Sequence, residues 1–315
     1  MKQSGKVAFV FPGQGSQYVG MGKDLYAQFA VAGRVFLEAD EALGFPLSQL
    51  CFAGPESDLK LTENTQPAIL TVSVAALRVL ESETSLKADF VAGHSLGEYT
   101  SLVCAGALGF QDAVRIVRER GRLMQQAVPA GAGAMAVILG LGMEVVQSLC
   151  EAVSNGEVVA PANYNGGGQI VIAGSKAAVT RAMSIAKEYG AKRVLDLPVS
   201  APFHCQLMRP AAEGLGKVLD DVTVYPFSLG VITNVEADVN LDAGRVKSLL
   251  IEQAVQPVRW EESVRKLESL GCVRVWEIGP GKVLKGLINR INRALQVDNF
   301  EAPQDLGKLL PEELA

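Results

Sequence analysis

Histidine and cysteine are scarce in this chain, and both shortages narrow the chemistry that it can perform. The 315 residues include two histidines, His94 and His204, so a catalytic imidazole has only two possible positions. The five cysteines are scattered, odd in number and form no Cys-x-x-Cys pair. This pattern argues against a disulfide framework or a zinc site and favours a reducing compartment. We therefore expect a cytoplasmic protein without a bound metal.

Long apolar runs and an excess of basic charge are also missing. The apolar run at residues 7–11 is far too short for a signal peptide or a membrane span. The chain carries 29 basic and 34 acidic residues, a net charge of -5, so bulk charge does not indicate nucleic-acid binding. Hydrophobic residues make up 49% of the chain, enough at this length for a substantial core. We expect neither nucleic acid nor a membrane as a partner.

One stretch carries a recognisable catalytic pattern, Gly93-His94-Ser95-Leu96-Gly97. A short strand-like run at 88–92 precedes it, and a helical pattern follows at once. Gly-x-Ser-x-Gly between a strand and a helix is typical of a nucleophile elbow, which exposes the serine hydroxyl at the edge of a parallel sheet. The helix N-terminus there offers free backbone N–H groups to an oxyanion. The motif alone is common by chance, so it predicts acyl transfer through Ser95 only with support from elsewhere in the chain.

A glycine-rich turn follows the first predicted strand, residues 6–11. The turn, residues 12–17, matches the first glycine pair of a dinucleotide-binding fingerprint, but Tyr18 stands where the third glycine belongs. The Rossmann interpretation therefore fails. Either the turn packs against an active site, because ligands gather at the carboxyl ends of parallel strands, or it is a plain strand-to-helix turn.

An arginine interrupts the apolar face of a predicted helix that starts at residue 110. At 100° per residue, Arg120 falls in the middle of an arc that includes Val117 and Met124. Burying a guanidinium without a partner is costly. One interpretation is a structural ion pair, or a side chain that reaches the surface. The other is a guanidinium that faces a cleft and binds an anionic ligand.

The composition changes at the small-residue segment 128–133, and a different pattern follows. We predict strands at 134–140, 157–162, 169–173 and 192–197, with helices at 143–153 and 175–188. This βαββαβ order is that of a ferredoxin-like fold. We therefore predict a small ferredoxin-like subdomain, residues 129–198, inserted into a large α/β-hydrolase-like domain with a parallel sheet, residues 1–128 and 199–315.

In the large domain we expect further helices and strands, and a polar tail that forms a surface appendage over 298–315. The expected helices cover 20–43, 64–81, 205–219, 245–254, 259–270 and 283–293, and the strands cover 229–233 and 273–278. The second of these helices is expected to start near Thr65, with Pro67 in its first turn.

The second histidine, His204, lies in a loop that returns to the large domain. A histidine in such a loop is more often a structural residue than a catalyst. His94, however, sits beside Ser95 on the elbow and cannot easily reach back to it, which favours His204 as the base. Asn163 and Asn165 lie in a glycine-rich turn, where turn formation is the simpler role.

Together these pieces resemble the malonyl-CoA:acyl carrier protein transacylases of fatty acid synthesis. The matching segments follow the family's order from residue 7 to about 290, and they are 11–17, 65–68, 93–99, 120–121, 163–165, 203–204 and 253–260. The resemblance implies that Ser95 is the nucleophile and His204 its general base. It implies that Arg120 binds the free carboxylate of the malonyl group.

The resemblance also implies supporting roles for other residues. Backbone N–H groups of Gln14 and Leu96 would form the oxyanion hole, and the main-chain carbonyl of Gln253 would orient the histidine. Asn165, Phe203 and Met124 would contribute to the substrate site, and His94 would support the elbow.

The substrates implied by the resemblance are malonyl-CoA and a phosphopantetheinylated acyl carrier protein, with no further cofactor, and we expect a monomer. Such carriers are acidic, so docking needs a local basic patch. The candidates are Lys187, Lys192, Arg193, Lys282, Lys285 and Arg290.

Two other function classes remain possible from the residues alone. A serine hydrolase would place an acid between serine and histidine, and Asp196 has that position in the chain. That interpretation leaves Arg120 unexplained. A non-catalytic docking module is the third class, against which the presence of Ser95, His204 and Arg120 argues.

Overall fold

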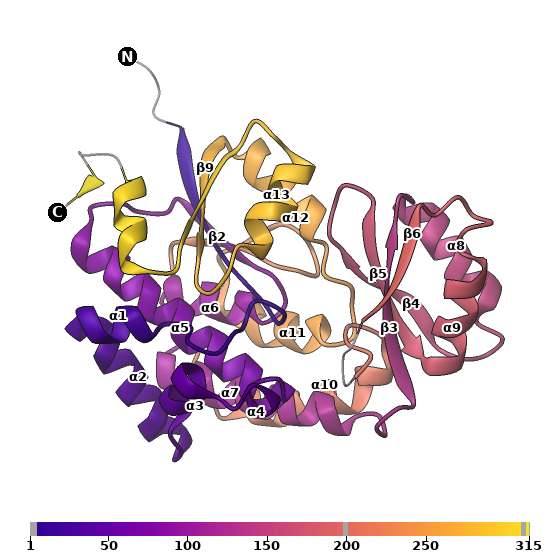
Figure 1. Ribbon diagram of the computed structural model, residues 1–315, viewed down its shortest axis with the longest axis horizontal. Helices are drawn as coiled ribbons and strands as arrows, with labels where there is room; N and C mark the ends of the chain where they lie inside the picture. Colours follow the sequence, from indigo (N-terminus) through magenta and orange to yellow (C-terminus); the bar gives the residue numbers. More distant parts are fainter. Residues whose placement is uncertain (1–4, 198–200, 310–312, 315) are drawn as a thin grey trace.

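Two separate β-sheets organise the chain (Figure 1). The computed structural model describes residues 5–197, 201–309 and 313–314. One sheet has the strand order β10-β9-β1-β2-β7-β8, and the other has the order β4-β5-β3-β6. In Figure 1 the four-stranded sheet and its helices lie to the right of the rest of the molecule. The predicted α/β class, with a parallel sheet and a separate ferredoxin-like unit, is confirmed.

The six-stranded sheet is parallel except at one edge, where β8 runs antiparallel to β7. The central strand β1 is flanked by β2 and β9 and is apolar on both faces, as buried parallel strands are. The strands are β1 (Lys6–Phe11), β2 (Phe90–Gly93), β7 (Gly230–Ile232), β8 (Val239–Asn240), β9 (Cys272–Ile278) and β10 (Gln296–Phe300).

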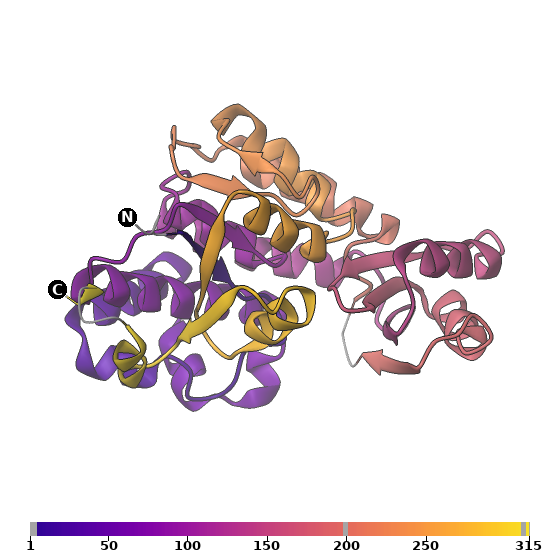
Figure 2. The ribbon, with the colours of Figure 1, turned by 90° about the horizontal axis from the view of Figure 1, so that it is seen from above.

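Helices cover both faces of this sheet (Figure 2). Alternate residues of β1 belong to two different cores. Phe9 and Phe11 pack into the larger core, while Ala8 and Val10 pack into the smaller one. The larger core involves α1 (Lys23–Gln28), α2 (Ala30–Leu43), α3 (Leu47–Ala53), α4 (Glu56–Leu59), α5 (Thr62–Glu83), α6 (Gly97–Cys104), α7 (Phe110–Gln126), α10 (Arg209–Asp220) and α11 (Ala243–Gln253). The smaller core involves α12 (Trp260–Ser269) and α13 (Val283–Ile291). No helix in the described ranges is long and apolar enough to cross a bilayer.

The four-stranded sheet is antiparallel throughout and has the strand order of a ferredoxin-like unit. Its elements are β3 (Gly133–Leu139), α8 (Met143–Val153), β4 (Val159–Tyr164), β5 (Gln169–Ser175), α9 (Lys176–Ile185) and β6 (Arg193–Leu197). Ala136 and Ile138 of β3 face α8 and α9, whereas Met135 and Val137 face residues of the large part, including Met124 and Phe203. The predicted elements of this unit agree with the structure to within a few residues, but the predicted boundary at 198 and 199 lies outside the described residues.

Two helix predictions in the large part need correction. The helix expected at 20–43 is two helices, α1 and α2, because Phe29 between them is extended. The helix expected at 64–81 is α5, which begins at Thr62, so Pro67 lies in its second turn and not in its first. The apolar periodicity did not reveal the break at Phe29 because α2 starts at the residue after it, which leaves the apolar spacing almost unchanged.

The prediction of a surface appendage over 298–315 is wrong for the part of that tail that forms β10 and the turn after it. β10 pairs in parallel with β9, and Phe300 is fully buried in the larger core. Asp305 then accepts hydrogen bonds from the backbone N–H groups of Glu301 and Ala302, at 2.9 and 3.0 Å. The strand carries only two apolar residues, Val297 and Phe300, which is why its polar composition concealed it.

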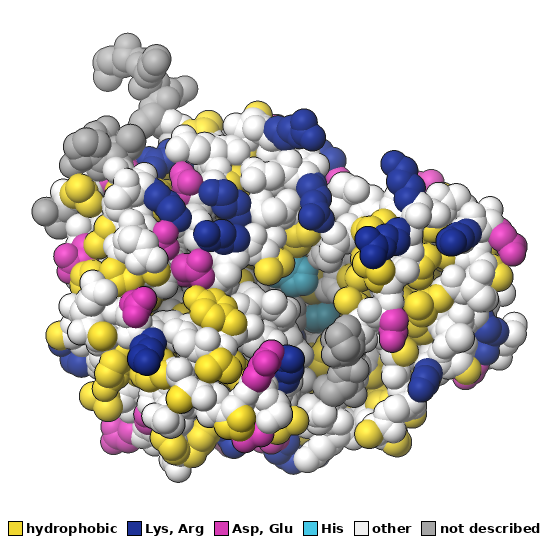
Figure 3. All heavy atoms as spheres, in the orientation of Figure 1, with side chains coloured by type: hydrophobic (Ala, Val, Ile, Leu, Met, Phe, Trp, Pro, Cys, Tyr) yellow, Lys and Arg dark blue, Asp and Glu magenta, His cyan; other side chains and the backbone are white. Residues whose placement is uncertain are grey.

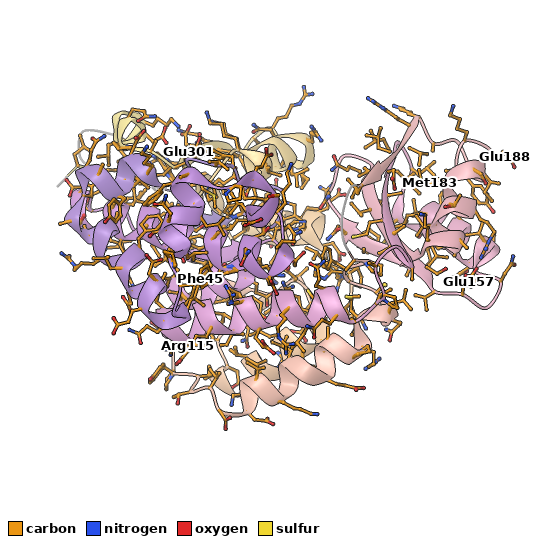
Figure 4. The ribbon with its side chains drawn as sticks, turned by 60° about the horizontal axis from the view of Figure 1, so that its bottom comes forward. Phe45, Arg115, Glu157, Met183, Glu188 and Glu301 are labelled. Atoms are coloured by element: carbon orange, nitrogen blue, oxygen red, sulfur yellow. The ribbon has the colours of Figure 1, made fainter. Side chains whose placement is uncertain are left out.

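The long helix α7 connects the site to the rest of the large part. It packs against α5 and α10 (Figure 4), and its start is anchored where the Arg115 side chain donates to the Ala42 carbonyl, at 3.1 Å. From there the helix runs toward the small sheet and carries Arg120 and Met124 inward, both at most 2% exposed.

The buried tail has a testable energetic consequence. Phe300→Ala should lower the free energy of unfolding by about 3–5 kcal/mol, because it removes a ring from the core of the sheet. Leu314→Ala, at a side chain that is 48% exposed, is the matched control and should change stability by less than about 0.5 kcal/mol. Denaturant unfolding measures both, and equal values for the two variants would contradict the assignment of the tail to the core.

Candidate active site

The elbow turn joins β2 to α6 at the carboxyl edge of the parallel sheet. Ser95 has a φ of 52°, a left-handed conformation that is strained for a residue with a side chain. A Cβ on Gly93 would lie 1.9 Å from the carbonyl carbon of Gly97, and a Cβ on Gly97 would lie 2.0 Å from the Phe11 oxygen. Both glycines of the motif are therefore required by close backbone approach.

Ser95 and His204 meet across the site, 109 positions apart in the sequence. The Ser95 hydroxyl donates to His204 Nε2 at 2.7 Å, and His204 Nδ1 donates to the main-chain oxygen of Gln253 at 2.8 Å. A carbonyl can only accept, so the proton sits on Nδ1 and Nε2 is the free acceptor. His204 is also left-handed, with a φ of 58°.

The imidazole of His204 is held in its neutral form. Burial and the nearby positive charge of Arg120 lower the pKa of His204 from 6.5 to about 3. A neutral imidazole at physiological pH can accept the serine proton, as a general base must.

Arg120 is buried, with 2% of its surface exposed, and it points at the nucleophile. Nη2 donates to Ser95 Oγ at 3.1 Å and to the side-chain oxygen of Gln253 at 2.9 Å, and Nη1 donates to Gln66 at 2.7 Å. The guanidinium carbon lies 5.4 Å from the centre of the Tyr99 ring, and burial lowers the pKa of Arg120. Arg120 has no ion pair within the described ranges, and its Nε has no hydrogen-bond partner there. It is neither a structural ion pair nor a side chain that reaches solvent.

The other histidine has a supporting position. His94 Nε2 is 2.9 Å from the side-chain oxygen of Asn165, and its ring centre lies 5.7 Å from that of Trp260. The Ser95 hydroxyl is hydrogen-bonded to His204, whereas the His94 ring is engaged by Asn165 and Trp260. Asn165 therefore does more than form a turn, because it joins the small sheet to the elbow.

A cavity of about 130 Å³ opens in front of Ser95. Seven of the predicted site residues line it, namely Gln14, Ser95, Leu96, Arg120, Met124, Phe203 and His204. A second cavity of about 290 Å³ adjoins it and shares Gln14 and His94, with Asn165 on one wall and α13 on the other. In Figure 3 the histidine side chains lie at the bottom of the hollow between the two parts of the molecule.

The glycine-rich turn after β1 packs directly against the elbow. A Cβ on Gly13 would lie 2.4 Å from the His94 carbonyl oxygen, and the Ser16 hydroxyl donates to the Gly13 carbonyl at 2.9 Å. The plain-turn interpretation is therefore wrong. Within the described part of the chain, the backbone N–H groups of Gln14 and Leu96 enter no hydrogen bond, so both are free to serve an oxyanion in the cavity that they line.

Three buried polar residues of the site were missed by sequence reasoning: Gln66, Glu98 and Asn234. Gln66 accepts from Arg120, and Glu98 accepts from the Gln253 side chain at 2.8 Å and from the Asn234 backbone N–H at 3.0 Å. Burial raises the pKa of Glu98 to about 7. The sequence could have pointed to Glu98 as a site residue, because it is a carboxylate one residue after the motif at the start of an apolar helix. Nothing in the sequence pointed to Asn234.

The candidate acid of a serine-hydrolase triad does not line the cavity in front of Ser95. Asp196 lies in β6 and lines a different pocket, together with Lys176 and Met183. His204 is oriented by a main-chain carbonyl and not by a carboxylate. Among the described residues, no three histidine, cysteine or acidic side chains gather as ligands for a metal ion.

The chain has close relatives of known name. A family model described as an acyl transferase domain matches residues 8–312. The malonyl CoA-acyl carrier protein transacylase of Bacillus subtilis (strain 168) is 51% identical over 302 residues, covering 96% of this chain and 95% of that protein. The protein of the same name from Escherichia coli (strain K12) is 45% identical over 303 residues, covering 96% of this chain and 98% of its own.

Solved structures match over the same length. An acyl carrier protein S-malonyltransferase from Vibrio cholerae O1 biovar eltor str. N16961 matches with a TM-score of 0.93 and 48% identity, covering 96% of this chain and 99% of that one. A structure described as a type II PKS acyl-carrier protein in complex with its malonyl-transacylase matches with a TM-score of 0.94 and 44% identity, covering 96% and 98% of the two chains.

The depressed pKa of His204 predicts how the reactivity of Ser95 depends on pH. An ordinary imidazole, with a pKa of 6.5, is mostly protonated at pH 5, whereas His204 stays neutral. The rate at which a small neutral sulfonyl fluoride modifies Ser95 should therefore fall less than about twofold between pH 7.5 and 5. Intact mass against time measures this rate.

The control for this experiment is Glu98→Gln, which removes the other titrating group near Ser95. A midpoint near 7 that vanishes in Glu98→Gln would belong to Glu98. A midpoint near 6.5 that persists in it would contradict a neutral, buried His204.

Proposed function

We propose that this chain, which belongs to the acyl transferase family, transfers a malonyl group from malonyl-CoA to the phosphopantetheine thiol of an acyl carrier protein. The chain is an acyltransferase of the malonyl CoA-acyl carrier protein transacylase type. The transfer passes through an ester on Ser95, so that one substrate leaves before the next one binds. The reaction needs no metal and no redox group, because each step exchanges a thiol and an alcohol at one carbonyl carbon.

The observation that carries this proposal is the buried guanidinium of Arg120 beside the nucleophile. Its Nη2 lies 3.1 Å from Ser95 Oγ, and its hydrogen-bond partners are uncharged. An acyl group on Ser95 that ends in a carboxylate would place that carboxylate against the guanidinium, which can bind both of its oxygens. An acetyl group would leave the buried charge without an anion.

The first half of the reaction follows from the Ser95–His204 contact. Ser95 Oγ attacks the thioester carbonyl carbon while its proton passes to His204 Nε2. The negative charge that develops on the carbonyl oxygen is stabilised by the backbone N–H groups of Gln14 and Leu96. The carbon–sulfur bond then breaks, and His204 returns its proton to the leaving thiolate of coenzyme A.

The second half reverses these steps with the carrier's thiol. His204 Nε2 removes the thiol proton, the sulfur attacks the ester carbonyl, and Ser95 Oγ leaves with the proton restored. The Gln253 carbonyl keeps the proton of His204 on Nδ1 in both halves, and it stabilises the imidazolium that forms transiently.

The remaining site residues shape the acyl pocket and its entrance. Met124 and Phe203 supply apolar walls beside Arg120, and Asn165 holds His94 at the junction of the two cavities. The second cavity leads toward α13 and offers a route for the pantetheine arm that both substrates share.

Basic side chains on both sides of the hollow support docking of an acidic carrier (Figure 3). Val283 is 47% exposed and lines the second cavity, between Lys282 and Lys285. On the small unit, Lys187 and Lys192 lie between α9 and β6, and Arg193 begins β6. Arg290 of α13 spans the two parts, because its side chain donates to Gln169 of the small sheet at 2.8 Å.

Acylation of Ser95 is the first prediction of this mechanism. Mixing the protein with malonyl-CoA should add one malonyl group to its intact mass, and adding phosphopantetheinylated carrier should remove that group and malonylate the carrier. Ser95→Ala should show no adduct. Release of free malonate at the same rate with and without carrier would favour a hydrolase instead, and an adduct that persists in Ser95→Ala would exclude Ser95 as the nucleophile.

Selection for malonyl is the second prediction. Arg120→Ala should lower kcat/KM for malonyl-CoA about a hundredfold or more, since two charge-assisted hydrogen bonds are lost at roughly 1.5–3 kcal/mol each. Acetyl transfer should be unchanged or faster. Arg122→Ala, on the same helix but paired with Glu119 at the surface, is the matched control and should leave both rates unchanged. Equal loss on both substrates in Arg120→Ala would make Arg120 structural.

A further inference from the structure

The elbow turn leaves two peptide groups that neither the strand nor the helix can satisfy. These are the Gly93 carbonyl, at the end of β2, and the Ser95 N–H, which lies before the first residue of α6. The Gly93 carbonyl is buried and the Ser95 N–H is partly buried, and peptide groups without partners in such places are costly. The turn also forces Ser95 to a φ of 52°, which needs support from its surroundings.

One side chain satisfies both groups. Asn234, 1% exposed and two residues after β7, accepts from the Ser95 N–H through Oδ1 at 2.7 Å and donates from Nδ2 to the Gly93 carbonyl at 2.6 Å. β7 is the direct neighbour of β2, which brings Asn234 beside the turn. A short amide is suited to this task because it accepts and donates at once on adjacent atoms.

Asn234 is itself held in place by its backbone. Its N–H donates to Glu98 at 3.0 Å, and its carbonyl accepts from the Arg259 N–H at 3.1 Å. Glu98 belongs to α6, the helix that the elbow starts. The amide of Gln253 completes the arrangement, because it donates both to Glu98 and to the Ser95 carbonyl, at 2.8 and 3.0 Å.

We propose that Asn234 is a positioning residue for the nucleophile: its side chain clamps the strained turn on both sides of Ser95 and thereby aims the hydroxyl at His204. Asn234 does not line the cavity in front of Ser95, so it acts through the turn and not on the substrate. This inference rests on the proposed function only in that Ser95 is the reacting group.

The two hydrogen bonds of the Asn234 side chain also limit which backbone N–H groups can donate to the oxyanion. The Ser95 N–H is occupied by Asn234 and cannot turn toward the substrate without losing that bond. This leaves the next N–H along the helix, that of Leu96, together with that of Gln14. A loosened turn would therefore disturb the hydroxyl and the Leu96 donor together.

The test compares Asn234→Ala and Asn234→Asp with the unaltered protein. The Asp variant keeps the acceptor for the Ser95 N–H but sets a carboxylate oxygen, which cannot donate, against the Gly93 carbonyl, so it should also lose Ser95 reactivity. In Asn234→Ala, kcat for malonyl and for acetyl transfer should fall together by about tenfold to a hundredfold, the range expected for small misplacements of reacting groups, with KM for malonyl-CoA within about twofold. Modification of Ser95 by a neutral sulfonyl fluoride should slow by the same factor.

The matched control is Asn240→Ala. Asn240 is 3% exposed, and its amide likewise bridges a backbone N–H and a carbonyl, both of Asp242 at 3.1 Å, but it does not touch the site. Thermal unfolding of all variants measures the structural cost. Asn240→Ala should lose comparable stability and keep full Ser95 reactivity.

Three results would overturn the proposal. One is normal Ser95 reactivity in both Asn234 variants, and another is an equal loss of reactivity in Asn240→Ala. The third is a loss confined to KM for malonyl-CoA. If Asn234→Ala does not fold, Asn234→Asp decides between these outcomes. The sulfonyl fluoride reports on Ser95 whether or not malonyl is the true substrate, so this test can fail separately from the proposed function.

Discussion

A buried positive charge, whose hydrogen-bond partners among the described residues are all neutral, is the constraint on which the site depends. The guanidinium of Arg120 is held by the amide oxygens of Gln66 and Gln253, which stabilise it without neutralising it. Glu98 binds the other end of the Gln253 amide, and this contact turns the oxygen of that amide toward Arg120. The same charge helps to keep His204 neutral. The Arg120 charge therefore serves anion recognition and, together with burial, keeps His204 in the neutral form that can accept a proton.

The parallel sheet explains how residues so distant in sequence come together. The carboxyl ends of β1, β2 and β7 lie side by side and supply Gln14, Ser95 and Asn234. The small sheet contributes the opposite wall, and α7 links the two parts by carrying Arg120 and Met124. This arrangement follows the general rule that ligands bind at the carboxyl edge of parallel sheets.

Sequence patterns predicted the parts of this site whose residue types conflict with their surroundings. Ser95 between two glycines, and Arg120 on an apolar arc, are visible without coordinates because the local chemistry is unusual. Asn234 could not be found in this way, since an asparagine after a short strand resembles any turn residue. Its partners are peptide groups 139 and 141 positions away, and only the pairing of β2 with β7 relates them. The tail was misjudged for a related reason, because β10 gains its burial from β9 and not from its own composition.

The strand order has a consequence for how the chain acquires its structure. The small sheet is built from one continuous segment, residues 133–197, and its four strands pair with one another, apart from a single bridge between Asn163 and Val258. The central strand β1, in contrast, must wait for β9, which begins more than 260 residues later. During synthesis the inserted unit can therefore form while the surrounding sheet is still incomplete, because contacts between distant residues close last. His204 and the Gln253 carbonyl that orients it both follow the inserted unit in the sequence, so the contact between the nucleophile and its base can form only after that unit has been synthesised.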